Sequence, residues 1–301
     1  MKKYLSIFLV FVLVSGFVYG LEIVAPKGPP SVPLIKLTED NPNYKLSLYT
    51  DILTEVIPEF MKADEKIYVM PTNVMAKFYN KNVNLKILNV TSSGMLYILS
   101  NSNKIKTISD LKNDKIYVPA PGSSPDIVTR YYLKKKGINV DIKYSSSPEI
   151  AKLFIAGKIQ NCVLPEPYAS KAIFMNKKAK RILNFKEGWK NIAGTDQIPQ
   201  VGLVAKVSYI EANKKEIDKF LMDYKKAVNW VNNNPKIAAK LASKKLGISE
   251  KIIELSIPKM NLISLQSKQA YKVLKNYFNI LNEDNKKVIG GKIPDEKIIY
   301  K

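Results

Sequence analysis

Histidine is absent from this chain of 301 residues, and cysteine occurs only once, as Cys162. Without histidine, the chain cannot form Ser-His-Asp or Cys-His catalytic sites, and it lacks the commonest ligand of zinc and copper. A single cysteine excludes an intrachain disulfide. Because Cys162 lies in an apolar stretch, we expect a buried structural thiol. The sequence therefore predicts no catalytic residue, no metal site and no cofactor, and we expect that the protein is not an enzyme.

Acidic residues are few relative to basic ones: 26 Asp and Glu stand against 48 Lys and Arg, for a formal net charge of +22. Such an excess can attract nucleic acid, anionic lipid or anionic solutes. Lysines, however, are scattered over every segment, and arginine is scarce. This pattern does not form a focused nucleic-acid face, so we expect no nucleic-acid partner.

No apolar run is long enough to span a bilayer, but a shorter one follows Lys2 and Lys3. It covers residues 5–18, about 14 positions against the roughly 20 that a membrane helix needs. A charged start, a short apolar middle and small residues at the end are typical of a secretory signal peptide. We predict a cleaved leader at residues 1–20 and a periplasmic or otherwise extracytoplasmic mature protein; an uncleaved anchor is the alternative. No cysteine follows the run, so lipidation at that point is excluded.

Beyond the leader, short apolar strands alternate with amphipathic helices, and the pattern then starts a second time. Predicted strands cover residues 21–26, 45–50, 66–70, 85–90, 115–119, 141–144, 161–164 and 201–205. Such alternation indicates an α/β fold with mostly parallel strands and helices on both faces. After Gln200 the pattern is largely helical. We expect Thr72 to cap the helix after the third strand and Ser264 to cap a late helix.

The doubled pattern predicts two lobes. The helical C-terminal part must cover another surface, and packing it on the first lobe makes that lobe discontinuous. We assign residues 21–97 and 208–301 to lobe 1, and residues 98–207 to lobe 2.

Several short segments stand in a characteristic order and spacing: Pro26 to Ser31, Thr72-Asn73, 108–112, Gly122 to Pro125, 153–158, Asn161 to Pro167, and Trp230 to Pro235 with Ala238-Ala239 beyond. Together they resemble the extracytoplasmic solute-binding proteins of ABC importers, in the nitrate, sulfonate and thiamine-precursor group. The resemblance implies the two-lobed periplasmic binding protein type II clamp, with mixed sheets and two hinge crossovers. It also implies a small solute in the cleft, ABC permease subunits in the membrane as partners, and a monomer.

Ligands of open α/β sheets gather outside the carboxyl ends of strands, where helix N-termini present free N–H groups. Five strand-end segments carry small or polar residues. For each of them a plain structural role, as a rigid turn, a helix cap or a hinge, remains the alternative. The predicted solute-binding residues are Gly28, Pro30, Ser31, Thr72, Asn73, Ser92, Ser93, Ser123, Ser124, Glu166 and Tyr168.

Glu166 is the candidate that bears most on ligand identity. A carboxylate facing the cleft would accept hydrogen bonds from an amine or aminopyrimidine and would repel nitrate or a sulfonate. The alternative is a solvated loop residue or an ion-pair partner. Tyr168 either stacks on a flat ligand or packs under its loop. The predicted solute is accordingly a small organic molecule, a heterocycle, a sulfonate or similar.

Two functions of other classes stay open at this point. One is an enzyme on the same fold that resembles pyrimidine-precursor or menaquinone-pathway enzymes. Those enzymes depend on histidine or cysteine chemistry, or on a cysteine-rich segment, and this chain lacks these features. The other is a sensor or adhesin domain in which the clamp signals to a membrane partner.

Overall fold

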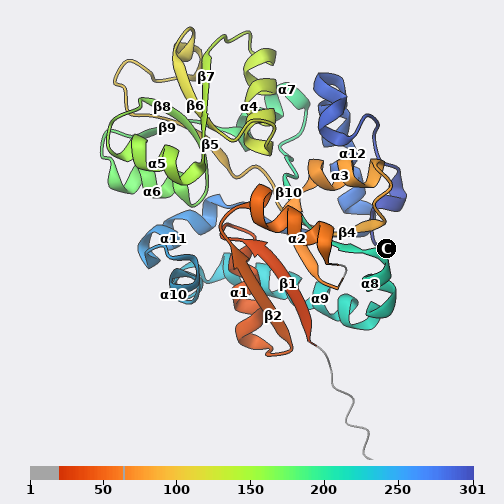
Figure 1. Ribbon diagram of the computed structural model, residues 1–301. Helices are drawn as coiled ribbons and strands as arrows, with labels where there is room; N and C mark the ends of the chain where they lie inside the picture. Colours follow the sequence, from red (N-terminus) through yellow and green to blue (C-terminus); the bar gives the residue numbers. More distant parts are fainter. Residues whose placement is uncertain (1–19, 64) are drawn as a thin grey trace, which may run out of the picture.

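The computed structural model of the protein describes residues 20–63 and 65–301, so the predicted leader lies outside the described residues except for Gly20. In the described part of the chain, no helix combines the length and apolar character needed to cross a bilayer. The chain forms two lobes, each built on one mixed β-sheet with helices packed against it (Figure 1). This arrangement agrees with the predicted α/β class.

The first lobe contains a six-stranded sheet. Its strands are β1 (Leu21–Pro26), β2 (Tyr44–Tyr49), β3 (Ile67–Pro71), β4 (Leu85–Ser92), β10 (Val201–Lys206) and β11 (Leu262–Leu265). They are arranged in the order β11-β4-β10-β3-β1-β2. Strand β1 pairs in parallel with β2 and β3, whereas β10 runs antiparallel to both β3 and β4. The carboxyl ends of β1, β3 and β4 therefore lie at one edge, together with the amino end of β10.

The second lobe contains a five-stranded sheet. Its strands are β5 (Leu96–Ser100), β6 (Lys115–Pro119), β7 (Asp141–Ser145), β8 (Asn161–Pro165) and β9 (Lys180–Asn184). The order is β7-β6-β8-β5-β9, with β6 parallel to β7 and β8, and with β5 antiparallel to β8 and β9. The carboxyl ends of β6 and β8 thus share one edge of this sheet.

Helices cover both sheets. Those that follow strands of the first sheet, or belong to the C-terminal part, are α1 (Ser31–Asp40), a π-helical turn (Ile52–Val56) that runs into α2 (Ile57–Lys62), α3 (Thr72–Asn80), α8 (Val207–Ala212), α9 (Lys214–Asn233), α10 (Pro235–Leu246), α11 (Glu250–Ser256) and α12 (Ser267–Asn285). The second lobe carries α4 (Ser124–Lys135), α5 (Ser147–Ile155), α6 (Tyr168–Met175) and α7 (Phe185–Ala193). Short 3-10 turns lie at η2 (Ile108–Leu111), η3 (Ile257–Lys259), η4 (Lys286–Ile289) and η5 (Glu296–Ile298).

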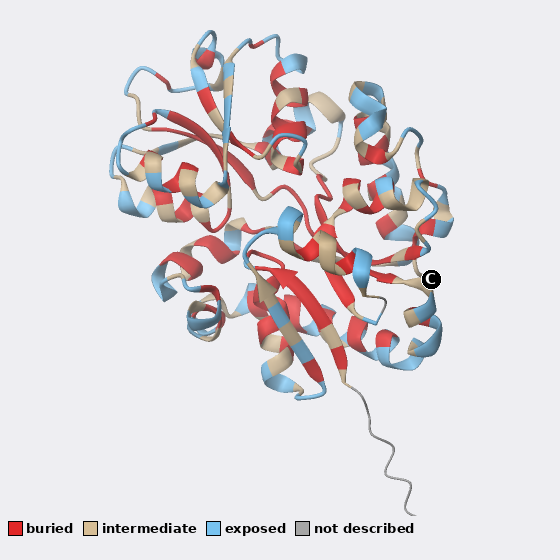
Figure 2. Ribbon diagram, in the orientation of Figure 1, coloured by how far each residue is buried: buried red, intermediate tan, exposed pale blue. Residues whose placement is uncertain are grey.

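Buried apolar side chains form three clusters between these layers (Figure 2). One lies between the first sheet and α1, α9 and α10, and it buries the helical stripe of α9 that the sequence shows from Ile217 to Val231. Another lies between the second sheet and α5 and α6, where Cys162 is fully buried as expected. The largest cluster spans both lobes: Trp189 of α7 lies 6.4 Å from Tyr277 of α12, measured between ring centroids. Helix α12 therefore packs against both lobes.

Strands β5, β9 and β11 are absent from the sequence prediction. Two predicted assignments also differ from the structure, namely the lobe that contains β10 and the role of Ser264. Strand β10 pairs with β3 and β4, so it belongs to the first sheet and not to the segment 98–207 assigned to lobe 2. Ser264 is not a helix cap: it lies in β11 and accepts a hydrogen bond from Asn89 Nδ2 (2.8 Å), while α12 begins only at Ser267. The sequence pattern predicts helix α12 but not the short strand β11 that precedes it.

Candidate functional site

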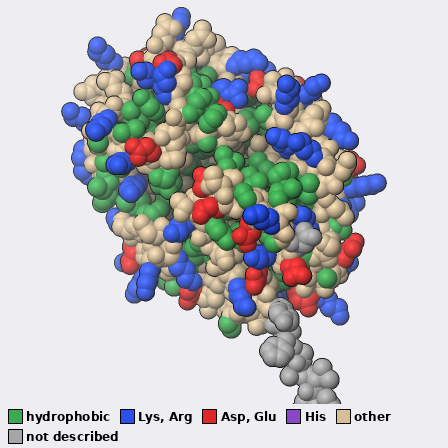
Figure 3. Space-filling view, in the orientation of Figure 1, with side chains coloured by type: hydrophobic (Ala, Val, Ile, Leu, Met, Phe, Trp, Pro, Cys, Tyr) green, Lys and Arg blue, Asp and Glu red, His purple; other side chains and the backbone are tan. Residues whose placement is uncertain are grey.

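The carboxyl-end edges of the two sheets meet at the crossover between the lobes. Ser92 ends β4, Leu96 begins β5, and Leu96 pairs with Pro165 at the end of β8. The polar strand ends of both sheets are thereby brought to one interlobe edge, which we call the cleft edge. On the face shown in Figure 3, the surface is hollowed between the lobes, and apolar side chains gather around the hollow.

The turn after β1 leaves unfilled space at this edge. Gly28 is buried, yet a Cβ atom built on it would meet no atom within 4 Å. Ser31, the first residue of α1, donates from its hydroxyl to the Pro26 carbonyl (2.6 Å). Pro30, in the N-cap position, provides no side-chain cap. The N–H groups of Ser31 and Val32 donate to the Gly28 and Pro29 carbonyls (3.1 and 3.2 Å), and Pro33 has no N–H, so the first turn of α1 offers a ligand no free donor.

Thr72 does not cap α3, in contrast to the prediction. It is the first helical residue, and it is held by two bonds to the returning chain: its hydroxyl donates to the Pro199 carbonyl (2.6 Å) and its N–H to the Gln200 carbonyl (3.0 Å). Helix α3 consequently has no side-chain cap. The next residue, Asn73, is buried, and its Oδ1 atom has no hydrogen-bond partner.

Gln200 joins the two lobes and was missed by the sequence analysis. Its Nε2 atom donates to Ser124 Oγ (3.0 Å) at the start of α4, while its Oε1 atom is buried without a partner. Only 1% of Gln200 is exposed. The predicted site residues all follow strands, whereas Gln200 precedes β10. Because β10 is antiparallel to its neighbours, its amino end lies at the cleft edge, and this orientation was the missing signal.

Ser92 and Ser93 have the bonding pattern of crossover residues. Ser93 Oγ accepts from the Ile198 N–H (2.8 Å) and thus links the outgoing and returning segments. The Ser93 N–H donates to the Asn261 carbonyl (3.1 Å), and Asn261 Nδ2 donates to the Gly94 carbonyl (2.7 Å). Ser92 Oγ lies 3.7 Å from Met95 Sδ. These bonds favour the hinge alternative for both serines.

Glu166 is an ion-pair partner. Its carboxylate is fully buried, with Oε1 2.8 Å from Arg181 Nη2, and with Oε2 accepting from the Ser170 N–H (3.0 Å). Burial raises the pKa of Glu166, and the neighbouring Arg181 charge acts in the opposite direction. Both carboxylate oxygens already have partners. The geometry therefore fits the ion-pair alternative and not a carboxylate that waits for a ligand.

The remaining candidates have local structural contacts. Ser123 caps α4: its Oγ accepts from the Asp126 N–H (3.5 Å) and donates to the Pro119 carbonyl (2.8 Å). Asp126 is itself held by Arg130 and by the Tyr144 hydroxyl. Tyr168 is half-buried and packs against the cluster beneath α5 and α6, as its alternative interpretation predicts.

The cleft edge is therefore polar but locally neutral. Its two acidic groups, Glu166 and Asp126, are each paired with an arginine. It offers a ligand the uncapped start of α3, hydroxyls, and the unpaired oxygens of Asn73 and Gln200. Buried polar groups are normally hydrogen-bonded, so these two oxygens are candidate acceptors for a ligand at this edge. Over the described residues, no group of three or more Cys, Asp or Glu side chains is placed to hold a metal ion.

A family model matches residues 74–245, more than half of the chain, and its description is "NMT1-like family". The chain belongs to the NMT1-like family. The matched segment of this NMT1-like chain begins just after Thr72 and Asn73 and includes the whole second lobe and β10. No curated protein is similar enough in sequence to match it.

Solved structures share the NMT1-like fold over nearly its full length. An ABC transporter from Parabacteroides distasonis aligns with a TM-score of 0.79 at 20% identity, covering 94% of this chain and 99% of that one. The periplasmic aliphatic sulphonate binding protein SsuA from Escherichia coli gives 0.75 at 17%, covering 94% and 92%. The periplasmic nitrate-binding protein NrtA from Synechocystis PCC 6803 gives 0.69 at 13%, covering 94% and 87%. These alignments confirm the predicted periplasmic binding protein fold.

Proposed function

We propose that this protein is the extracytoplasmic solute-binding component of an ABC importer, and that it captures a small solute between its lobes for delivery to a membrane permease. Its family and fold support the proposal, since solved proteins with this fold include sulphonate- and nitrate-binding proteins. The proposed role is binding without chemical change. A cleaved leader, a location outside the cytoplasm and a monomeric state belong to the same proposal.

One observation at the cleft edge carries the proposal most directly. The unpaired oxygens of Asn73 and Gln200 belong to two segments that are hydrogen-bonded to each other through Thr72. An unpaired buried carbonyl costs about 1–3 kcal/mol. A ligand that reaches both oxygens and donates hydrogen bonds to them would remove this cost.

The same edge favours a particular class of solute. The uncapped start of α3 favours an anionic oxygen group, because a helix N-terminus carries partial positive charge. The unpaired oxygens favour N–H or O–H donors. Since Glu166 is neutralised by Arg181, it no longer argues against an anion. We therefore propose a small organic solute with one acidic group, such as a sulfonate, and at least one hydrogen-bond donor.

Native mass spectrometry of the mature protein, purified without refolding, tests the proposal. We expect a carried-over small molecule at one copy per chain, recovered chemically unchanged. Adding that molecule to stripped protein should stabilise the fold by about 2.7 kcal/mol at a hundredfold excess over Kd. Finding no stabilising solute among organic acids, or a solute that is consumed on incubation, would count against the proposal.

A substitution at Gly28 locates the solute. Gly28→Val places two methyl groups and a Cβ atom in the unfilled space beside α1. We expect solute affinity to fall about 10- to 100-fold, which corresponds to about 1–3 kcal/mol of overpacking, with little change in the melting temperature. The matched control is Ala212→Val, an exposed position at the end of α8, which should leave affinity unchanged.

A further inference from the structure

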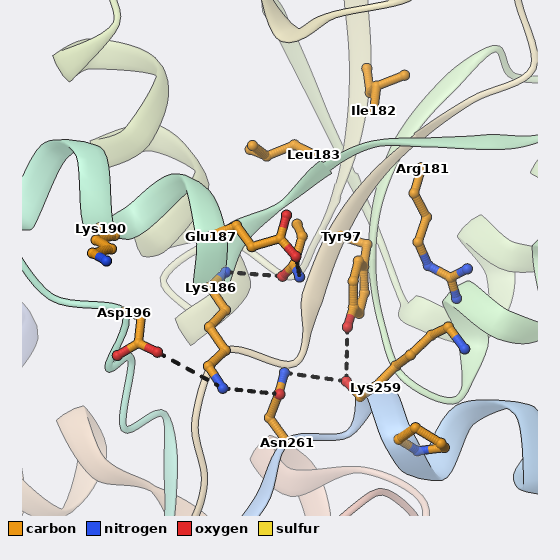
Figure 4. A pocket seen from close by; sticks show the side chains of 12 residues that line it. Tyr97, Arg181, Ile182, Leu183, Lys186, Glu187, Lys190, Asp196, Lys259 and Asn261 are labelled. Atoms are coloured by element: carbon orange, nitrogen blue, oxygen red, sulfur yellow. Dashed lines mark hydrogen bonds and ion pairs between the residues drawn. The ribbon is translucent and has the colours of Figure 1, made fainter.

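A cavity adjoins the crossover segments. It has a volume of about 760 Å³, and none of the described residues that line it is a candidate residue of the cleft edge. Residues of β5, β9 and α7 form one wall, and residues of η3 and the turn before β11 form the other (Figure 4). We call it the hinge-side pocket, and its principal lining residues are Tyr97, Arg181, Lys186, Lys190, Lys259 and Asn261.

Positive charge predominates in this pocket. Four cationic side chains line it, against the two acidic side chains of Glu187 and Asp196. Asp196 lies 4.0 Å from Lys186 Nζ, and Glu187 accepts a hydrogen bond from Asn184. Lys190 and Lys259 have no acidic partner among the described residues; Lys259 Nζ donates only to the Leu255 carbonyl (2.8 Å). The pocket thus holds two cations that no carboxylate of the described chain neutralises.

Arg181 is held in a fixed orientation at the wall of the pocket. Its Nη2 atom donates to Glu166 (2.8 Å) and to Ser170 Oγ (2.9 Å), and its Cζ atom lies 4.9 Å from the centre of the Tyr97 ring. The Arg181 side chain is still 23% exposed. A planar guanidinium that is already oriented and remains partly exposed is well suited to bind an oxyanion.

The cationic ends of Arg181 and Lys259 lie on the same side of Tyr97 (Figure 4). Arg181 comes from β9 of the second lobe, whereas Lys259 comes from η3, which leads into β11 of the first lobe. The Tyr97 hydroxyl donates to the Lys259 carbonyl (2.9 Å) and thereby keeps the two walls together. Lys259 has no carboxylate partner among the described residues, and an anion held against it and beside the oriented guanidinium of Arg181 would be attracted to both groups.

We propose that the hinge-side pocket binds a small oxyanion, a phosphate or a carboxylate, between Arg181 and Lys259. The bound anion contacts both lobes on the side of the crossovers, away from the solute. This inference rests on the geometry of the pocket and does not depend on the proposed function, because it concerns residues outside the cleft edge.

Isothermal titration of the mature protein with inorganic phosphate, and separately with succinate, tests the proposal in a low-salt buffer without other oxyanions. We expect saturable binding of at least one of the two at one site per chain. Lys259→Gln should weaken that binding about tenfold, as expected for the loss of one charge-assisted hydrogen bond. Lys244→Gln, which removes the same charge from an exposed position of α10, should change it by less than about twofold.

Three results would overturn the proposal. The first is no binding of either anion at millimolar concentration. The second is an equal loss in the two lysine variants, which would reflect net charge alone. The third is binding that Gly28→Val abolishes and Lys259→Gln leaves intact, which would place the anion at the cleft edge. If Lys259→Gln does not fold, Lys259→Arg, expected to keep binding, and Arg181→Lys, expected to weaken it, provide the same test.

Discussion

The cleft edge and the hinge-side pocket both adjoin the crossover between the lobes, but they are built from different chemistry. At the cleft edge, the acidic groups are buried and paired, and the groups left for a ligand are the start of α3 and amide oxygens. In the hinge-side pocket, cations line a cavity that stays open to solvent. Glu166 and Arg181 form the boundary, because one residue belongs to each region.

This difference indicates how the two regions select ligands. Neutral dipoles that are fixed by the backbone recognise shape and hydrogen-bonding pattern, and they work in a site from which water is largely excluded. Exposed cations attract many anions with little discrimination, and salt screens them. We therefore expect the cleft edge to determine solute specificity, and the hinge-side pocket to respond to the ionic composition of the surroundings.

The largest effect is expected where the two regions share a bond. Glu166→Ala leaves Arg181 without its buried partner and the Ser170 N–H without its acceptor. Breaking a buried ion pair from one side costs about 3–5 kcal/mol, and we expect the lower value because Arg181 is 23% exposed. Denaturant unfolding measures the loss.

The matched control for that variant is Glu211→Ala, an exposed glutamate in α8. It should change the free energy of unfolding by less than about 0.5 kcal/mol. Equal losses in the two variants would mean that the Glu166–Arg181 pair contributes nothing beyond a surface charge.

A smaller effect is expected at the cleft edge alone. Gln200→Ala removes the hydrogen bond between the lobes to Ser124, which should lower the free energy of unfolding by about 1 kcal/mol. Solute affinity should fall about fivefold or more as well, because the variant also lacks the Oε1 atom. Calorimetry measures both the free energy of unfolding and the solute affinity. In the control Gln160→Ala, an exposed residue before β8, neither quantity should move.

The smallest effect is a difference in salt response. Raising sodium chloride from about 20 to about 200 mM should weaken oxyanion binding in the hinge-side pocket several-fold, since the Debye length shortens over this range. Solute binding at the buried cleft edge should change by less than about twofold. Parallel titrations of the two ligands measure how each affinity depends on salt concentration. The same salt dependence for both ligands would contradict the distinction between the two regions.

The sequence predicted the central strands well, because β1, β3, β6 and β8 are apolar runs bounded by turn residues. It missed β9, whose segment begins with Lys180 and Arg181, since a short edge strand with charged residues carries little hydrophobic pattern. It also missed β5, although Leu96–Ser100 is fully buried, because the run follows directly on the crossover without the usual helix between strands.

At the candidate site, the sequence predicted which strand ends would meet but not what each side chain does there. Thr72, Ser93 and Glu166 all lie at the cleft edge, yet the side chain of each is hydrogen-bonded to a residue elsewhere in the chain. The partners are, respectively, Pro199, Ile198 and Arg181. Partners so far apart in the chain are invisible to spacing arguments. Gln200 was missed for the same reason, because only the antiparallel pairing of β10 brings it to the edge.

The position of β4 has a consequence for the order in which the protein folds. Both neighbours of β4, the strands β10 and β11, come from segments that begin at Val201 and Leu262. A nascent chain that ends before Val201 contains all of β1 to β4 but leaves β4 unpaired along both sides. Contacts of such long sequence separation form slowly. The first lobe therefore cannot complete its sheet during synthesis of the N-terminal half, and the chain stays partly open until nearly all of it has been made.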